Sequence, residues 1–161
     1  IGVFGFQRQE KGGNLLLPLL EKISALGFNV IFQDSSNRPI EPISGVIQLG
    51  HVANLIDEIV QCDLILAPYR AEAYTKRGSG IIMNALSCGV PVIAPEGTAP
   101  GRLIAQTGAG VLFSQYTINS ILNALQSAIT NYDSLAEAAF VACRQWPTSH
   151  GVEKYLNAMI K

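Results

Sequence analysis

Apolar residues along this chain gather in short continuous runs, and most runs are followed by a stretch in which apolar residues recur at helical spacing. The runs are rich in β-branched residues and contain few polar ones, as strands do when helices cover both faces of their sheet. Six runs are predicted to be strands: Ile1–Phe6, Phe28–Phe32, Gly45–Leu49, Leu64–Ala67, Val90–Ala94 and Ala109–Phe113.

The stretches between these runs carry apolar stripes typical of amphipathic helices. The stripes are Leu16, Leu19, Leu20 and Ile23; Leu55, Ile56, Ile59 and Val60; and Ile118, Ile121, Leu122, Leu125 and Ile129. Two further helices are predicted, from Ile81 to Ser87 and, after Trp146-Pro147, from about His150 to Lys161. Glycines mark the predicted ends of three helices: Gly27, Gly89 and Gly108.

This β-α-β-α order predicts an α/β fold, a Rossmann-like doubly wound parallel sheet of about six strands, in a single domain with a C-terminal helix. Such sheets bind ligands at the carboxyl ends of their strands. The candidate loops are Gln7–Asn14, Gly50–Ala53, Pro68–Gly80 and Pro95–Arg102. The segment Asp34–Pro42, with several small polar residues and two prolines, is predicted to be an exposed loop.

Length and composition limit the class of protein. A chain of 161 residues, 48% hydrophobic and 14% charged, fits one folded domain and is too apolar for a disordered tail. Its net charge of -1 gives no general attraction to nucleic acid, so any anion site must be local. No apolar run approaches the roughly 18 to 20 residues that span a bilayer. Membrane association of a full-length protein is left open by this observation.

Cysteine content and the first residues bear on the compartment and on the extent of the chain. Cys62, Cys88 and Cys143 are odd in number and widely spaced in apolar surroundings. We therefore expect buried thiols of a cytoplasmic protein rather than disulfides or a metal site. The chain begins without Met, inside the first predicted strand, so we expect residues 1–161 to be one domain of a longer polypeptide.

The loop Pro68–Gly80 carries the strongest chemical signal. It connects a buried strand to a helix, where free backbone N–H groups and the helix dipole attract anions. Lys76 and Arg77 add positive charge, and Ser79 adds a hydroxyl donor. The loop therefore predicts a site for a phosphate-bearing ligand. The alternative is an ordinary strand-to-helix turn capped by Ser79.

The loop after the first strand offers further phosphate ligands. Arg8 and Lys11 can reach phosphate oxygens, and Gly12 and Gly13 are predicted to open the next helix. The alternative is a solvated turn. The glycine spacing does not match Gly-x-Gly-x-x-Gly, which argues against a dinucleotide-binding Rossmann domain.

The two remaining loops give weaker signals. His51 directly follows the third predicted strand, and Glu96, Thr98 and Arg102 lie in the fourth loop. A structural histidine and a glycine- and proline-shaped turn are the alternatives. With two histidines far apart in the sequence, neither a Ser/His/Asp triad nor a metal cluster is indicated.

Taken in order, these motifs resemble the C-terminal half of the retaining glycosyltransferases of family 4, group 1. The shared pieces are Lys11-Gly12, Gly50-His51-Val52, Pro68-Tyr69-x-x-Glu72-x-Tyr74-x-x-Arg77-x-Ser79-Gly80, and Asn84-Ala85-Leu86-Ser87-Cys88-Gly89-Val90-Pro91-Val92-Ile93-Ala94. The resemblance covers essentially the whole chain. It implies a two-domain GT-B fold in which the C-terminal Rossmann-like domain holds the nucleotide-sugar donor and the final helix packs back toward the N-terminal domain.

The resemblance also implies roles for individual residues. The expected catalytic residues are Lys11 and Arg77, which would neutralise the donor diphosphate. The expected donor-binding residues are Arg8, Gly12, His51, Tyr74, Gly78, Ser79, Gly80, Asn84 and Thr98. Neither a metal nor a separate cofactor is expected, because the nucleotide-diphosphate sugar is a co-substrate. The acceptor would bind an N-terminal domain of the same chain.

Several positions depart from the family pattern. Two glutamates that the family has eight positions apart are Lys76 and Asn84 here, although Asn84 can still accept a hydrogen bond from a ribose hydroxyl. The family arginine after the first strand is Phe6, for which Arg8 is expected to substitute, and a third acidic position is Gly101. The expected function is therefore the donor-binding half of a hexosyltransferase that uses a UDP- or GDP-sugar, inactive alone. The alternative is a non-catalytic binding or interaction domain that keeps the fold.

Overall fold

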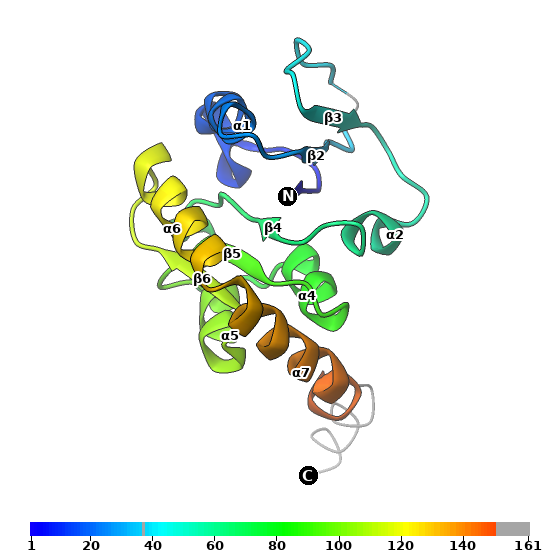
Figure 1. The fold of residues 1–161 in the computed structure, drawn as a ribbon, viewed down its shortest axis with the longest axis vertical. Helices are drawn as coiled ribbons and strands as arrows, with labels where there is room; N and C mark the ends of the chain where they lie inside the picture. The colour runs from blue at the N-terminus through cyan, green and yellow to red at the C-terminus, as the bar shows by residue number, and fades with distance from the viewer. Residues whose placement is uncertain (37, 151–161) are drawn as a thin grey trace.

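The computed structural model describes residues 1–36 and 38–150. Within them, six parallel strands form one sheet in the order β3-β2-β1-β4-β5-β6 (Figure 1). The strands are β1 (Gly2–Val3), β2 (Val30–Gln33), β3 (Val46–Leu49), β4 (Ile65–Leu66), β5 (Val92–Pro95) and β6 (Gly110–Phe113). Each strand overlaps one of the six predicted runs, so the predicted Rossmann-like parallel sheet is confirmed.

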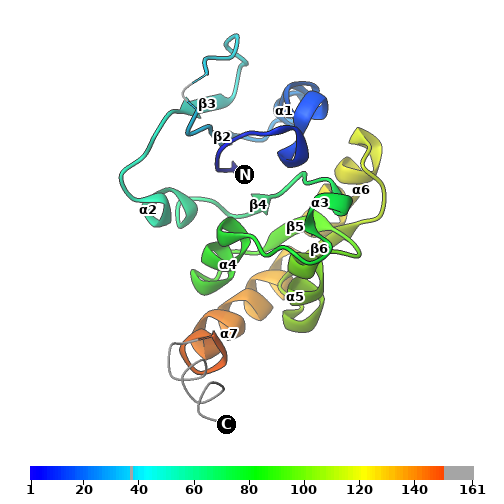
Figure 2. The ribbon, with the colours of Figure 1, turned by 180° about the vertical axis from the view of Figure 1, so that it is seen from behind.

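Helices cover both faces of this sheet (Figures 1 and 2). One face is packed by α1 (Leu16–Ala25) and α6 (Ile118–Thr130). The other is packed by α2 (Leu55–Ile59), α4 (Gly80–Ser87), α5 (Ala99–Thr107) and α7 (Tyr132–His150). The short helix α3 (Ala71–Tyr74) follows β4, and two 3-10 turns, η1 (Gln9–Lys11) and η2 (Gly13–Leu15), follow β1.

Successive side chains of a central strand enter opposite cores, which explains why the strands are continuously apolar. Ile65 packs with α4 and α7 on one face, whereas Leu64 and Leu66 pack with α1 and α6 on the other. Since each face is covered by helices, a polar residue on either side would lose its contact with water. The continuous apolar runs therefore indicate strands that are buried on both faces of the sheet.

Glycines at the α5–β6 junction are required by the backbone. Gly108 ends α5 in the left-handed region, with φ of 70°, as predicted for a helix stop. Gly110 starts β6 where a Cβ would lie 1.9 Å from the carbonyl oxygen of Val92 on β5. Glycine is therefore needed at both positions, once for its conformation and once for the close approach of two strands.

The loop predicted at Pro95–Arg102 is partly wrong, because α5 begins inside it. Thr98 caps this helix and Ala99 is its first residue, followed by Pro100 in the first turn, where proline is tolerated. Gly12 and Gly13 also do not open an α-helix as predicted. They join η1 to η2 with φ of 123° and 45°, and α1 begins only at Leu16.

The C-terminal region differs from the prediction as well. Helix α7 runs from Tyr132 through Pro147 to His150, a stretch in which no helix was predicted from the sequence. Its buried residues are Leu135, Ala139 and Ala142, and the two small alanines give a weak apolar stripe. The final helix predicted from His150 to Lys161 lies outside the described residues from 151 onward. No described helix is both long and apolar enough to traverse a bilayer.

The start of the segment predicted as an exposed loop is buried. Asp34 directly follows β2 and has 5% of its surface exposed. One carboxylate oxygen accepts the N–H groups of Gln7 (3.1 Å) and Ser36 (2.9 Å), and the other accepts the Ser36 hydroxyl at 2.6 Å. These bonds tie the loop after β1 to the loop after β2. Burial alone would raise the pKa of Asp34, but these hydrogen bonds and the charge of Arg38 hold it below its usual value.

The strand order reverses between β1 and β4. From β1 the chain moves to β2 and β3 on one side, and it then returns to β4 on the other side of β1. The loops after β1 and β4 consequently lead to helices on opposite faces of the sheet, α1 and α4. In doubly wound sheets this divergence opens the crevice in which ligands bind.

Candidate functional site

The loops after β1 and β4 are joined at this crevice. The N–H of Arg70 donates to the carbonyl oxygen of Glu10 at 2.9 Å. Gly12 is buried against Pro68, whose Cγ would lie 3.5 Å from a Cβ at this glycine. From the loop after β6, the Tyr116 hydroxyl donates to the Gly12 carbonyl oxygen. Three strand ends thus hold one another in place.

Lys11 extends over the end of β1. Its Nζ lies where a Cβ on Gly5 would be 2.8 Å away, and Gly5 has φ of 111°, so only glycine gives the ammonium this position. The ammonium also lies 5.6 Å from the centre of the Tyr69 ring, within cation–π range. Burial lowers the pKa of Lys11, and the charges of Arg77 and Arg8 lower it further. A bound anion would offset the effects of burial and of the two guanidinium charges, and would stabilise the charged form of Lys11.

Arg77 and Arg8 are exposed and converge on one carboxylate. Their Nη1 atoms lie 3.7 Å and 3.9 Å from Glu10 Oε1. The Arg77 guanidinium also lies 5.2 Å from the centre of the Tyr74 ring. With Lys11, these three cations and one carboxylate leave a local excess of two positive charges in a chain whose net charge is -1.

Two stacked tyrosines form the floor beneath these cations. The ring centres of Tyr69 and Tyr74 are 4.4 Å apart, with 20° between the ring planes. The Tyr69 hydroxyl shares a hydrogen bond of 3.2 Å with the Ser79 hydroxyl, and burial raises its pKa. The Tyr74 hydroxyl is buried with no hydrogen-bond partner in the described residues, and burial raises its pKa too. The tyrosines therefore stay neutral and shape the site rather than supply charge.

Helix α4 points its N-terminus into the same crevice. Ser79 is its N-cap, and the buried hydroxyl accepts the N–H of Ile82 at 3.4 Å. This leaves the N–H groups of Gly80 and Ile81 without a hydrogen bond among the described residues. Gly78 and Gly80 are exposed, and a Cβ at either would meet nothing within 4 Å. An anion can therefore approach the end of the helix dipole.

Other residues considered in the sequence analysis lie at different positions relative to Lys11, Arg77 and the N-terminus of α4. Asn84 follows Gly80 by one helical turn on α4, is partly exposed, and its side chain forms no hydrogen bond in the described residues. Lys76 is exposed in the loop before α4. His51 is exposed after β3, which lies three strands from β4, or about 14 Å across the sheet. The strand order by itself does not bring His51 to Arg77.

Thr98 is not available to a ligand, which corrects its prediction as a donor-binding residue. Its side chain is completely buried. The hydroxyl donates to the Pro95 carbonyl oxygen at 2.8 Å and accepts the N–H of Gly101 at 2.9 Å. Both bonding directions are used inside the protein, so Thr98 is the N-cap of α5.

Sequence reasoning missed several residues that build the site. Glu10 links Arg8 to Arg77, Tyr69 supports both Lys11 and Ser79, and Tyr116 closes the loop after β1. The position of Tyr69, directly beyond a buried strand, was a usable signal. Tyr116 gave no comparable signal, because its contact with Gly12 spans 104 positions of the sequence.

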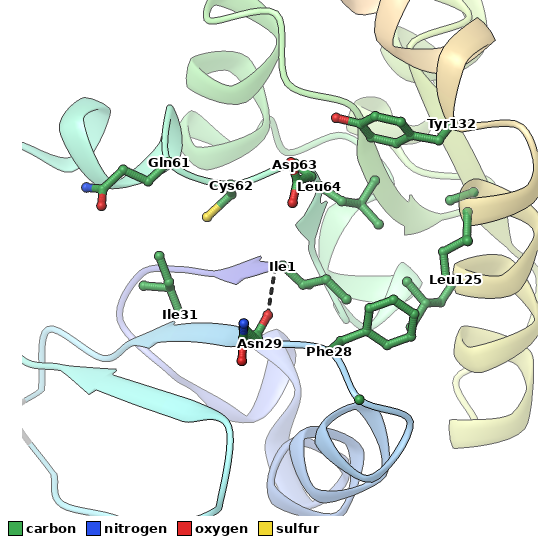
Figure 3. A pocket seen from close by; sticks show the side chains of 13 residues that line it. Ile1, Phe28, Asn29, Ile31, Gln61, Cys62, Asp63, Leu64, Leu125 and Tyr132 are labelled. Carbon is green, nitrogen blue, oxygen red and sulfur yellow. Dashed lines mark hydrogen bonds between the residues drawn. The ribbon is translucent and has the colours of Figure 1, made fainter.

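A separate cavity lies at the opposite edge of the sheet, at the amino-terminal ends of the strands. It measures about 670 Å³ and is bordered by Ile1, Asn29 and Leu64, which precede β1, β2 and β4 (Figure 3). Phe28 and Leu125 give it an apolar lining. None of the basic residues described above reaches it. In residues 1–36 and 38–150, no group of three or more His, Cys, Asp or Glu side chains could hold a metal ion.

A family model described as "Glycosyl transferases group 1" matches residues 9–131 of this chain. This match includes the loops that carry Lys11 and Arg77 and the helix α4 that carries Asn84. A search of the curated proteins gave no match.

Several solved structures share the fold. Alr3699/HepE of Anabaena, in complex with UDP, is 19% identical, with a TM-score of 0.76 over 99% of this chain and 46% of that protein. WaaG, a glycosyltransferase involved in lipopolysaccharide biosynthesis, is 17% identical, with a TM-score of 0.70 over 93% of this chain and 43% of that protein. S. aureus TarM, in a complex that includes UDP, is 15% identical, with a TM-score of 0.76 over 99% and 34%. The chain thus spans less than half the length of each.

Proposed function

Since the chain belongs to the group 1 glycosyl transferases and its fold is consistent with a C-terminal GT-B domain, we propose that it binds the diphosphate of a nucleotide-sugar donor. The observation that carries the proposal is the meeting of three anion-binding elements at the β1–β4 crevice. Lys11 comes from the first loop, Arg77 from the second, and the free N–H groups of Gly80 and Ile81 from α4. The UDP in the complexes of the similar HepE protein supports this ligand class.

The chemistry follows from where charge develops. When the sugar leaves its donor, the nucleoside diphosphate gains negative charge at the oxygen that is released. Lys11, Arg77 and the α4 N-terminus belong to elements that meet at one crevice, so they stabilise that charge with little reorganisation. Transfer also needs a hydroxyl of an acceptor molecule. We assign the site that binds this acceptor to a further domain of the full-length protein. The isolated chain should therefore bind the donor and transfer nothing.

Calorimetric titration of the 161-residue chain tests the diphosphate assignment. UDP, GDP and ADP are each compared with the matching nucleoside. Each charge-assisted hydrogen bond contributes about 1.5–3 kcal/mol, so at least one diphosphate should bind more than about tenfold more tightly than its nucleoside. Equal affinity of nucleoside and diphosphate for every base would remove the phosphate site from the crevice.

The competing function is a non-catalytic binding domain that keeps the fold. Asn84 and Lys76 favour it, because they stand where the family has carboxylates. A carboxylate at position 84 accepts charge-assisted hydrogen bonds from a ribose, which the neutral amide of Asn84 cannot match. The two functions therefore differ in what position 84 contacts.

Asn84→Glu separates the two functions. Because Asn84 is partly exposed and its side chain has no partner in the described region, the new carboxylate should be tolerated. Under the donor-binding function, nucleoside diphosphate should bind about 1 kcal/mol more tightly. Met83→Glu, at the neighbouring exposed position, is the matched control and should leave affinity unchanged. No gain for Asn84→Glu at an unchanged melting temperature would favour the non-catalytic domain.

A further inference from the structure

Glu10 places a carboxylate inside the basic β1–β4 crevice. It lies on η1, directly before Lys11, and 26% of its side chain is exposed. Its backbone carbonyl oxygen accepts the N–H of Arg70 at 2.9 Å, which joins this segment to the loop after β4. The carboxylate is therefore held among the cations that are proposed to bind the diphosphate.

The two ion pairs of Glu10 are loose. Its Oε1 atom lies 3.7 Å from Nη1 of Arg77 and 3.9 Å from Nη1 of Arg8, whereas charge-assisted hydrogen bonds are about 2.7–2.9 Å long. Both guanidinium side chains are more than half exposed. Exposed pairs of this kind add little to stability, so folding of the domain does not explain why a carboxylate lies here.

Glu10 acts electrostatically on the other titratable groups of the crevice. Burial and the charges of Arg77 and Arg8 lower the pKa of Lys11, and the charge of Glu10 opposes them. Burial raises the pKa of Tyr74 and Glu10 adds to that rise, whereas Arg77 and Arg8 lower it. The carboxylate thus influences groups on its own segment and groups that follow β4.

A nucleotide-sugar and the nucleoside diphosphate released from it differ in charge. Both phosphates of the donor are esterified, so it carries about two negative charges, whereas the product ends in a phosphate with a second pKa of about 6 and carries about three at neutral pH. Lys11, Arg8 and Arg77 are three cations, and with one carboxylate the crevice has an excess of two positive charges. This excess matches the donor rather than the product.

We propose that Glu10 determines how well the crevice discriminates between the nucleotide-sugar donor and the free nucleoside diphosphate. Coulomb repulsion by its carboxylate is proportional to the charge of the ligand, so it disfavours the product more than the donor. Release of product limits the turnover of many enzymes, and Glu10 keeps the three cations from retaining it. This role rests on the proposed function, because it requires the diphosphate to bind in the crevice.

Displacement calorimetry of UDP-glucose by UDP in the 161-residue chain measures this discrimination. Glu10→Gln keeps the length of the side chain and one hydrogen-bond acceptor but removes the charge. At about pH 7.5 it should bind UDP-glucose about fivefold more tightly than the parent and UDP about tenfold more tightly. The ratio of the two affinities should therefore shift about twofold toward UDP.

Two further variants are the controls. Glu10→Asp keeps the negative charge on a shorter side chain, so its ratio of UDP to UDP-glucose affinity should stay close to that of the parent. Glu21→Gln removes an exposed carboxylate from α1 and should leave both affinities unchanged.

The pH dependence separates a charge effect from a structural role. At about pH 5 the terminal phosphate of UDP has taken up a proton, so UDP and UDP-glucose carry nearly the same charge. The shift in the affinity ratio caused by Glu10→Gln should therefore be absent at about pH 5 and complete above about pH 7.5. A residue that only held Arg8 and Arg77 in place would change both affinities alike at each pH.

The failures of the two proposals are distinguishable. If Glu10→Gln binds both ligands more weakly, or gains equally for both at about pH 7.5, the discrimination by Glu10 is overturned and the donor function stands. The same holds if Glu10→Asp has the affinity ratio of Glu10→Gln, because the charge is then irrelevant. If neither UDP nor UDP-glucose binds any of these chains, the donor function fails for uridine nucleotides and the role of Glu10 fails with it.

Discussion

At the scale of single residues, the site is organised by the positions of a few charges. Glu10 pairs with both Arg8 and Arg77, and its single carboxylate offsets only part of their charge. Lys11 has the most perturbed environment of these groups, because it is partly buried beside two guanidiniums. The pKa of Lys11 should therefore respond strongly to a bound anion.

The affinity for UDP should fall as pH rises through the lowered pKa of Lys11. In the free chain, burial, Arg77 and Arg8 lower this pKa below that of an ordinary lysine. A bound diphosphate raises it, so the complex takes up a proton at a pH where free Lys11 has lost its own. Calorimetry between about pH 7 and about pH 11 should show the decline.

Lys11→Arg is the control for this pH dependence. Arginine does not titrate in this range, so its profile contains only the ionisation of the ligand, which also affects the parent. Lys11→Ala should bind UDP about tenfold more weakly at neutral pH, with little change in melting temperature. Identical pH profiles for the parent and Lys11→Arg would mean that Lys11 does not contact the diphosphate.

At the scale of elements, helix ends account for the differences between the predicted and the observed site. Ser79 caps α4 and at the same time contacts Tyr69 in the crevice floor, so one residue links helix geometry to ligand geometry. Thr98 has the same sequence character but caps α5 from a fully buried position. A hydroxyl before a helix therefore predicts a cap reliably, whereas its access to a ligand depends on burial.

Thr98→Ala should lower stability and leave UDP binding unchanged. It removes the acceptor for the N–H of Gly101 and the donor to Pro95, both out of reach of water, at a cost of about 2 kcal/mol. Thr117→Ala, which removes the exposed cap of α6, is the matched control and should cost less, about 1 kcal/mol. Urea denaturation measures both. Weakened UDP binding by Thr98→Ala at unchanged stability would restore Thr98 to the donor site.

At the scale of the whole molecule, the strand order brings distant segments together. Lys11 and Arg77 belong to loops that follow adjacent strands, although more than sixty positions separate them in the sequence. Asp34 adds a second connection, because it fastens the loop after β2 to Gln7 in the loop after β1. The charged edge of the sheet is therefore one structural unit held by buried polar groups.

Acid should weaken this unit through Asp34. Its pKa is lowered on folding, so it stabilises the fold above the pKa of the unfolded chain, and this contribution is lost as pH falls through the folded-state pKa. Asp34→Asn should cost about 1–3 kcal/mol near pH 7, and the difference from the parent should shrink toward about pH 3. Urea denaturation across this range measures it, with Asp63→Asn, an exposed position, as control. A difference that does not depend on pH would contradict the role of the charge.

The architecture could be predicted from local pattern because each strand is buried on both faces and is followed by a helix or a turn. The short strands β1 and β4 are recognisable from their apolar runs even though only two residues of each pair in the sheet. Helix α7 was not predicted, since alanines such as Ala139 and Ala142 bury little surface and leave a weak pattern. The hydrophobic pattern of the sequence therefore predicts an element where its buried side chains are large and apolar.

The sequence by itself determined the parallel α/β sheet, the loops that carry chemistry and the basic residues Arg8, Lys11 and Arg77. Only the tertiary structure decided that Glu10 joins two of these cations, that Tyr69 and Tyr74 lie beneath them, and that Thr98 is closed to ligands. The physical reason is the distance over which each kind of information extends. Periodicity reports the burial of a side chain relative to its own element, whereas a binding site depends on distances between elements, and these are set by strand order and by the packing of helices across the sheet.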